Sequence, residues 1–280
     1  MRKAQEFAVR ARPYAIASLE MLKNLLSRTP ALPPLLQTRE VKNSLLLVIT
    51  SDKGLAGAFN SNVLKKADSW AVGKKKNGLN YTLVTVGKRA RDYFERRRER
   101  VQESFWGFGD YSTLEETAPV AKTLLDGFLN GAWDEVEAVY TGFRTTLRQE
   151  AVLKKILPVT QQGIEEMVAG ILPERGRFAS LQAPSSKLQA PIYKYEYKFE
   201  PSPAEILEAL VPQLVRVHIH HIILESNASE HSARMVAMKN ASDNAGELIT
   251  DLTLEFNKSR QAGITRELTE ITAGKEALEQ

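Results

Sequence analysis

The chain has 280 residues, of which 26% are charged and 43% hydrophobic, and its formal net charge is +4. This composition is typical of a soluble globular protein with one large or two smaller domains, and so mild a charge does not by itself argue for nucleic acid. The sequence has no cysteine, which excludes disulfides, thiolate metal sites and thiol redox chemistry. It also has no apolar run long enough to cross a bilayer and no secretory signal at its start, so we expect a soluble, cytoplasmic protein without direct membrane insertion.

The first segment, residues 1–28, has a helical pattern with small side chains at steps of three and four. Pro13 should kink this helix because proline removes one backbone donor. Met1 falls in the middle of the pattern with no capping residue before it, so we expect a helix truncated at its start. A seam of alanines cannot form a core alone, and the segment therefore requires a helical partner. The seam consists of Ala4, Ala8, Ala11, Ala15, Ser18, Leu22 and Leu25.

A connector, residues 29–43, contains prolines that end this helix, and the pattern then changes over residues 44–200. Short apolar runs alternate with amphipathic stretches, which predicts crossover connections and a mostly parallel, Rossmann-like sheet. The segment 157–190 is expected to be irregular, and we find no internal repeat. Strands are expected at 44–50, 81–87, 105–108, 136–143 and 193–199, and helices at 61–71, 88–98 and 114–129.

The last segment, residues 203–280, predicts one very long helix with Ser202 as N-cap and Pro203 at its first position. A seven-residue repeat runs through it, which is typical of a left-handed supercoil, and about 65 residues would span roughly 100 Å. The first helix, of about 27 residues, would pair with it antiparallel only as far as Met238. The apolar residues beyond would then need another protein. The repeat consists of Leu207, Leu210, Leu214, Val217, His221, Leu224, Ala228, His231, Met235, Met238, Ser242, Ala245, Ile249, Leu252 and Phe256.

These elements give the predicted fold class. It is α/β, with a long antiparallel coiled coil of the N- and C-terminal helices and an inserted, mostly parallel domain. The expected division of the chain is 1–28, 29–43, 44–200 and 203–280.

Motifs for chemistry are weak. The turn from Gly54 to Gly57 after the first strand is neither a dinucleotide fingerprint nor a Walker A loop. His218, His221 and Glu225 share a helical face, but no second cluster completes a metal site, so polar packing in the seam is the better interpretation. There is no nucleophile elbow. We therefore expect no catalytic residue, no cofactor and no metal.

Two alternatives remain open on this reasoning. One is a nucleotide-binding α/β protein that dimerises through its long helix. The other is a self-contained coiled-coil scaffold.

Three stretches resemble the gamma subunits of F-type ATP synthases. Residues 257–271 are similar to the family signature N-K-x-R-Q-A-x-I-T-x-E-L-x-E-I, and residues 229–244 to S-E-x-x-A-R-M-x-A-M-x-x-A-x-x-N. Residues 51–60 resemble S-D-[KR]-G-L-C-G-G-L-N, with Ala56, Ala58 and Phe59 as departures. The family usually carries about thirty more residues before the position of Met1, roughly 45 Å of helix.

The resemblance implies a central rotor shaft in a proton-translocating ATP synthase. Its upper part would stand inside the ring of alpha and beta subunits, and the inserted domain would lie below, against the epsilon subunit and the membrane c-ring. The beta subunits would perform catalysis. Without the cysteine-bearing insertion of plastid forms, we expect a bacterial protein, peripheral on the cytoplasmic face of the inner membrane.

The resemblance also implies which residues bind these partners. The upper part of the shaft would contact beta-subunit loops, with Arg234 a weaker candidate lower down. Two further residues match positions at the foot, near the c-ring and epsilon. The upper contacts are Arg260, Gln261, Thr265 and Glu267, and the foot residues are Tyr197 and Glu200.

Overall fold

The structure is a computed structural model of the whole chain. It describes residues 25–26, 29, 32–109, 112–143, 149–160, 163 and 200–278, with side chains of the last helix described to residue 274. The chain divides into two units, Met1–Ala233 and Arg234–Gln280, and each is described by itself. The division falls inside the last helix, whose first part belongs to the same unit as the sheet.

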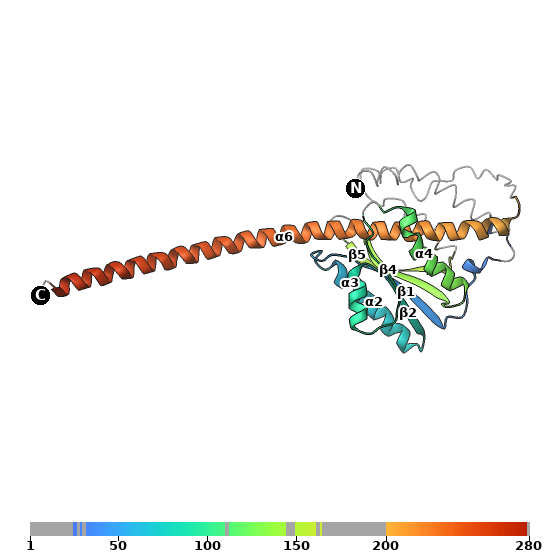
Figure 1. The fold of residues 1–280 in the computed structure, drawn as a ribbon, viewed down its shortest axis with the longest axis horizontal. Coiled ribbons are helices and arrows are strands. Elements are labelled where there is room, and N and C mark those ends of the chain that lie inside the picture. The colour runs from blue at the N-terminus through green and yellow to red at the C-terminus, as the bar shows by residue number, and fades with distance from the viewer. Residues whose placement is uncertain are drawn as a thin grey trace, which may run out of the picture. The chain divides into compact units, whose positions relative to one another are not determined.

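The described part of the first unit is built on a five-stranded sheet in the order β3-β2-β1-β4-β5 (Figure 1). The first four strands are parallel and β5 is antiparallel to β4. This confirms the expected mostly parallel α/β fold. The strands are β1 (Asn43–Ile49), β2 (Asn80–Val86), β3 (Val101–Phe105), β4 (Glu135–Phe143) and β5 (Gln149–Leu157).

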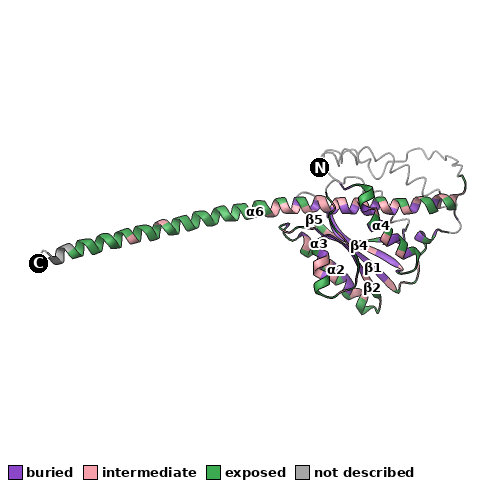
Figure 2. Ribbon diagram, viewed as in Figure 1, coloured by how far each residue is buried: buried purple, intermediate pink, exposed green. Residues whose placement is uncertain are grey.

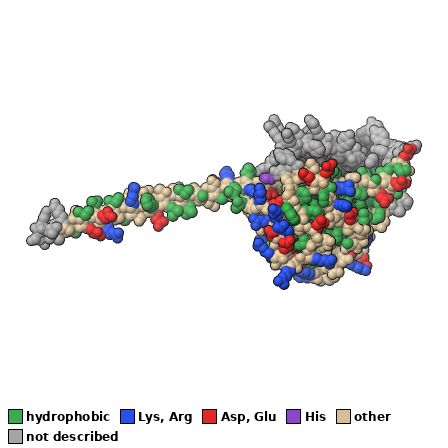
Figure 3. Space-filling model, in the orientation of Figure 1, with side chains coloured by type: hydrophobic (Ala, Val, Ile, Leu, Met, Phe, Trp, Pro, Cys, Tyr) green, Lys and Arg blue, Asp and Glu red, His purple; other side chains and the backbone are tan. Residues whose placement is uncertain are grey.

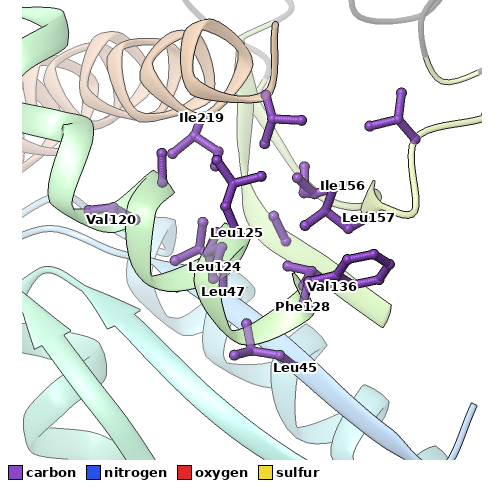
Figure 4. Close-up of a cluster of buried hydrophobic side chains, with 14 of the residues drawn as sticks. Leu45, Leu47, Val120, Leu124, Leu125, Phe128, Val136, Ile156, Leu157 and Ile219 are labelled. Atoms are coloured by element: carbon purple, nitrogen blue, oxygen red, sulfur yellow. The ribbon is translucent and has the colours of Figure 1, made fainter. Parts of the chain in front are cut away.

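Helices cover both faces of this sheet because successive strand residues point to opposite sides. Leu46 and Val48 of β1 pack with α2 (Phe59–Lys76) and α3 (Lys88–Arg96). Leu45 and Leu47 pack on the other face with α4 (Leu114–Leu129) and with α6 (Pro203–Leu278). Figure 4 shows part of this second core, where Ile219 of α6 lies near Val120 and Leu125 of α4. A short 3-10 helix, η1 (Pro34–Leu36), adds Leu35 and Leu36 to it.

The long helix α6 begins where the sequence predicts. Ser202 Oγ accepts the backbone N–H of Glu205 at 3.3 Å and donates to the Glu205 carboxylate at 2.8 Å. These bonds satisfy a backbone donor that has no partner within the helix. Pro203 is the first helical residue, as expected.

In the described structure, the most deeply buried face of α6 is not the one marked by the seven-residue repeat. The first helix, with which the repeat is expected to pair, lies almost entirely outside the described residues. Between residues 207 and 231 only Leu207 of that repeat is buried, and Val217 is exposed. The buried face is offset from the repeat because α6 lies on the core formed by the sheet and α4, which selects its own stripe (Figure 2). That stripe is Leu207, Val211, Val215, His218, Ile219, Ile222, Ile223, Ser226, Ser229 and Ser232.

Other elements agree in part with the sequence. The helix at 114–129 has the predicted bounds, and β1, β2 and β4 begin within a residue of prediction. The third strand lies at 101–105, not at 105–108, and β5 was missed. The expected strand at 193–199 and almost all of the first helix lie outside the described residues, although Leu25 is fully buried in the core. No helix in the described part of the chain is both long and apolar enough to cross a membrane.

Candidate partner-binding surfaces

The second unit carries an apolar stripe that is exposed. Ile249, Phe256, Ile264 and Ile271 recur at steps that bring them onto one side of the helix, and all four are exposed. Figure 3 shows hydrophobic side chains along this part of α6, with charged side chains between them. We name this face the distal stripe, after those four residues and Leu252. An exposed apolar face of this length is the usual mark of a binding surface.

Two predicted contact residues, Arg260 and Glu267, lie within the distal stripe. They flank Ile264, four residues before it and three after it, and all three are exposed. No opposite charge lies three or four residues from either of them, so neither can form an ion pair along the helix. They are seven residues apart, about 10 Å along the axis, which is too far to pair with each other. The charges are therefore available to a partner.

Gln261 and Thr265 are exposed on the adjoining side of the same helix, one turn apart. The Thr265 carbonyl accepts the hydroxyl of Thr269 at 2.8 Å, and Thr253 bonds the Ile249 carbonyl in the same way at 2.7 Å. These local bonds satisfy the threonine hydroxyls. The four predicted upper contacts thus occupy two neighbouring strips of one element.

The remaining predicted contact residues are more scattered. Arg234 is the first residue of the second unit and is half-buried. Glu200 is exposed just before α6 begins, and Tyr197 lies outside the described residues. Of the two residues predicted to lie near the c-ring and the epsilon subunit, only Glu200 is therefore in the described part of the chain.

The glycine turn after β1 is built around an internal carboxylate. Asp52 accepts the backbone N–H of Lys88, the first residue of α3, at 3.0 Å and that of Gly107 at 2.8 Å. Gly87, before Lys88, has φ of 92°, and a Cβ there would meet the Thr50 carbonyl oxygen at 2.2 Å. The Asp52 carboxylate thus occupies the N-terminus of α3, a position at which an anion could otherwise bind. This geometry gives the nucleotide-binding alternative no support.

The histidine cluster on α6 is tied into the domain by separate contacts. Burial, followed by the charges of His221 and Lys154, lowers the pKa of His218 to about 3, so this imidazole is neutral near pH 7. Glu225 is directed to the end of β4, where it accepts the N–H of Phe143 at 3.0 Å. The structure thus gives Glu225 a structural partner instead of a shared metal.

Sequence reasoning missed the polar contacts that join α6 to the domain. Besides Glu225, Asn227 bonds the carbonyls of Phe108 and Gly109, and Ser229 bonds the carbonyl of Thr141. The available signal was a run of polar residues on a helix stretch that also has to face a core. That signal does not say which backbone groups they reach.

Comparison with known proteins finds a matching family model and similar sequences. A family model described as ATP synthase matches residues 1–278. The chain is 41% identical over 283 residues to the ATP synthase gamma chain of Trichormus variabilis, covering 99% of this chain and 90% of that protein. The gamma chain of Nostoc sp. is 40% identical over the same length, with the same coverage.

Solved structures share the fold. A chain of the Euglena gracilis mitochondrial ATP synthase, in a structure with OSCP, F1 and c-ring, has a TM-score of 0.59 at 17% identity, covering 99% of this chain and 91% of that one. A chain of the central stalk and c-ring of the Tetrahymena thermophila mitochondrial ATP synthase has a TM-score of 0.55 at 20% identity, covering 86% and 98%.

Proposed function

The chain belongs to the ATP synthase gamma-chain family, and from that membership we propose that it is the central-stalk rotor, which transmits torque between the membrane c-ring and the catalytic alpha/beta hexamer. The observation that supports this role is the distal stripe. It is exposed, apolar and interrupted by two charges that have no partner along the helix. Such a face is suited to a socket formed by other subunits.

The rotor acts through differential contact and performs no bond chemistry itself. Each angle of the helix presents a different mixture of apolar and charged groups to a given beta subunit. A contact that favours one conformation of that subunit shifts its population, and with it the affinity for nucleotide. Catalysis resides in the beta subunits, and this chain is non-catalytic.

The other partners follow from the same role. Glu200 and Tyr197 lie near the start of α6 in the sequence, and we assign them to the foot, where the epsilon subunit and the c-ring bind. The complex places the chain peripherally on the cytoplasmic face of a bacterial inner membrane. Loops of the beta subunits bind the distal part of α6 through Arg260, Gln261, Thr265 and Glu267, with Arg234 lower down.

Charge reversal tests this assignment. In reconstituted complexes, R260E and E267K should lower ATP-driven proton pumping more than ATP hydrolysis, because a misplaced charge weakens the contact that links rotor angle to subunit state. Matched controls are R266E and D251K, which reverse exposed charges on other sides of the same helix. Proton pumping is followed by a pH-sensitive dye and hydrolysis by phosphate release. Pumping-to-hydrolysis ratios equal to those of the controls would remove Arg260 and Glu267 from the contact.

A further inference from the structure

We propose that four polar side chains of α6 form a collar that fixes the rotation of this helix about its own axis against the α/β domain. The collar consists of His220, Glu225, Asn227 and Ser229. It would be the place where torque passes between the domain and the helix, a role that rests on the proposed rotor function. All four residues, and the groups they bond as described below, lie in the first unit.

One side of the collar is bonded to the carboxyl end of β4. The Glu225 carboxylate accepts the N–H of Phe143 at 3.0 Å, and the Ser229 hydroxyl donates to the Thr141 carbonyl at 3.2 Å. Glu225 and Ser229 are one turn apart, so they lie on the same side of the helix. Their partners are backbone groups of β4, which at these residues is paired with β5. Because those groups belong to the backbone, they cannot follow a rotation of the helix by changing a side-chain rotamer.

The other side of the collar is bonded to the connection between β3 and α4 and to α4 itself. The Asn227 amide donates to the carbonyls of Phe108 at 3.3 Å and Gly109 at 3.1 Å. His220 Nδ1 lies 3.1 Å from the hydroxyl of Thr117, in the first turn of α4. His220 and Asn227 are seven residues apart, which brings them to nearly the same angle on the helix.

The two sides are nearly opposite. At 3.6 residues per turn, Asn227 points about 160° around the helix from Glu225. Bonds on opposite sides of a cylinder resist its rotation as a couple, whereas bonds on one side would let the helix roll around them.

Apolar packing selects the buried face of α6, but it does not by itself fix the rotation of the helix within that face. Ile219, Ile222 and Ile223 pack α6 onto the core, but the hydrophobic effect has no directional requirement. Hydrogen bonds do. At a side-chain radius of about 5 Å, rotation of the helix by roughly 20° moves its surface atoms by about 2 Å, enough to break bonds on both sides of the collar. The apolar contacts select the buried face, and the collar fixes the angle of the helix within that face.

The first experiment uses the full chain alone, so that it does not depend on the rotor function. The sequence has no cysteine, so two introduced thiols at exposed Asn77 and Ala209 carry the only spin labels. Double electron–electron resonance then gives the distribution of distances between α2 and α6. The variant E225A/N227A, which loses one group from each side, should broaden that distribution. The control E208A/Q213A truncates exposed side chains of the same helix and should leave it unchanged.

The second experiment uses the assembled complex with the hexamer immobilised and a rotation probe on the Asn77 thiol. If the four groups contribute equally, E225A/N227A leaves about half of the restoring torque and the variance of the probe angle rises about twofold. If this double variant does not assemble, the same comparison is made with N227A, which should give a smaller rise. Unchanged distance distributions and angular variance, even with a lower melting temperature, would overturn the collar. Broader distances in the free chain, together with a wild-type complex that does not couple rotation to pumping, would leave the collar standing and reject the rotor function.

Discussion

Lys74, near the end of α2, lies between two glutamates of the neighbouring strand β4. Its ammonium group pairs with Glu135 and, at 3.1 Å, with Glu137, and all three side chains are largely buried. Ser44 donates to Glu135 at 2.7 Å, and the Trp70 indole donates to Glu137 at 2.6 Å. Burial alone would raise the pKa of the Glu135 carboxyl, but hydrogen bonds from Lys74 and Ser44 outweigh it and hold that pKa below its ordinary value. The cluster thus joins one helix layer to the sheet.

Removing the lysine should therefore be costly. We expect K74M to lower the free energy of unfolding by about 2 kcal/mol at pH 7, at the low end for a buried pair because Lys74 keeps some contact with water. A carboxyl whose pKa is depressed by folding stabilises the protein above its unfolded pKa and loses that effect as pH falls through the folded value. The difference between wild type and K74M should therefore shrink as pH falls below about 4.3.

Urea unfolding at pH 7 and pH 3.5 measures both effects. The control is K75M, which removes the neighbouring lysine from its exposed pair with Glu99 and should change stability far less. Equal losses of unfolding free energy in K74M and K75M would show that the buried position of Lys74 adds nothing to stability.

At the scale of elements, the first part of α6 has its seven-residue apolar repeat along one face and its most deeply buried side chains along another. The seven-residue repeat passes through Val217, whose side chain is 41% exposed, whereas Val215 is fully buried. Both are valines on the same helix, two residues apart. The difference comes from the core that Leu47, Leu124 and other residues build beneath one side.

This pair of valines gives a matched test. V215A should lower the free energy of unfolding by about 2 kcal/mol, because it leaves a cavity in a packed core. V217A should stay within about 0.5 kcal/mol of wild type, as for most surface positions. Chemical denaturation followed by tryptophan fluorescence reports both. A larger loss for V217A would mean that the seven-residue repeat, and not the observed stripe, is the packed face.

At the scale of the whole molecule, the two units differ in how much apolar surface they expose to water. The described part of the first unit buries apolar residues on both faces of its sheet. The second exposes Ile249, Phe256 and other large apolar side chains. A monomer gains nothing from such exposure, and a subunit of a complex uses it for assembly. We therefore expect the chain alone to be poorly soluble.

A lysine substitution in the distal stripe distinguishes the stability of the isolated chain from its assembly with other subunits. Phe256 is 65% exposed, so F256K should leave the thermal stability of the isolated chain nearly unchanged and improve its solubility. It should sharply reduce assembly with alpha and beta subunits, because the charge would be buried there without a partner. The control L254K replaces another exposed apolar residue, about 160° around the helix. Assembly is measured by co-purification, and equal assembly of F256K and wild type would contradict the socket.

Local patterns in the sequence were sufficient for much of this protein. Strands buried on both faces appear as continuous apolar runs, so β1, β2 and β4 were predicted nearly to the residue. Helix α4 was predicted with its observed bounds. β5 was missed because an edge strand needs no such run, and its lysines and glutamate at 150–155 hide the pattern. Ile249, Leu252 and Phe256 of the distal stripe were predicted, because no tertiary partner within the described structure changes their face.

The sequence by itself determined the family, through signatures that span residues 229–271, and determined the layered α/β class through the order of strands and helices. Only the tertiary structure decided which side of α6 is buried, where β5 pairs, and which backbone groups the collar residues reach. The physical reason is the range of the interactions. Periodicity and capping act over a few neighbouring residues, whereas the Glu225–Phe143 bond joins groups 82 residues apart in the chain.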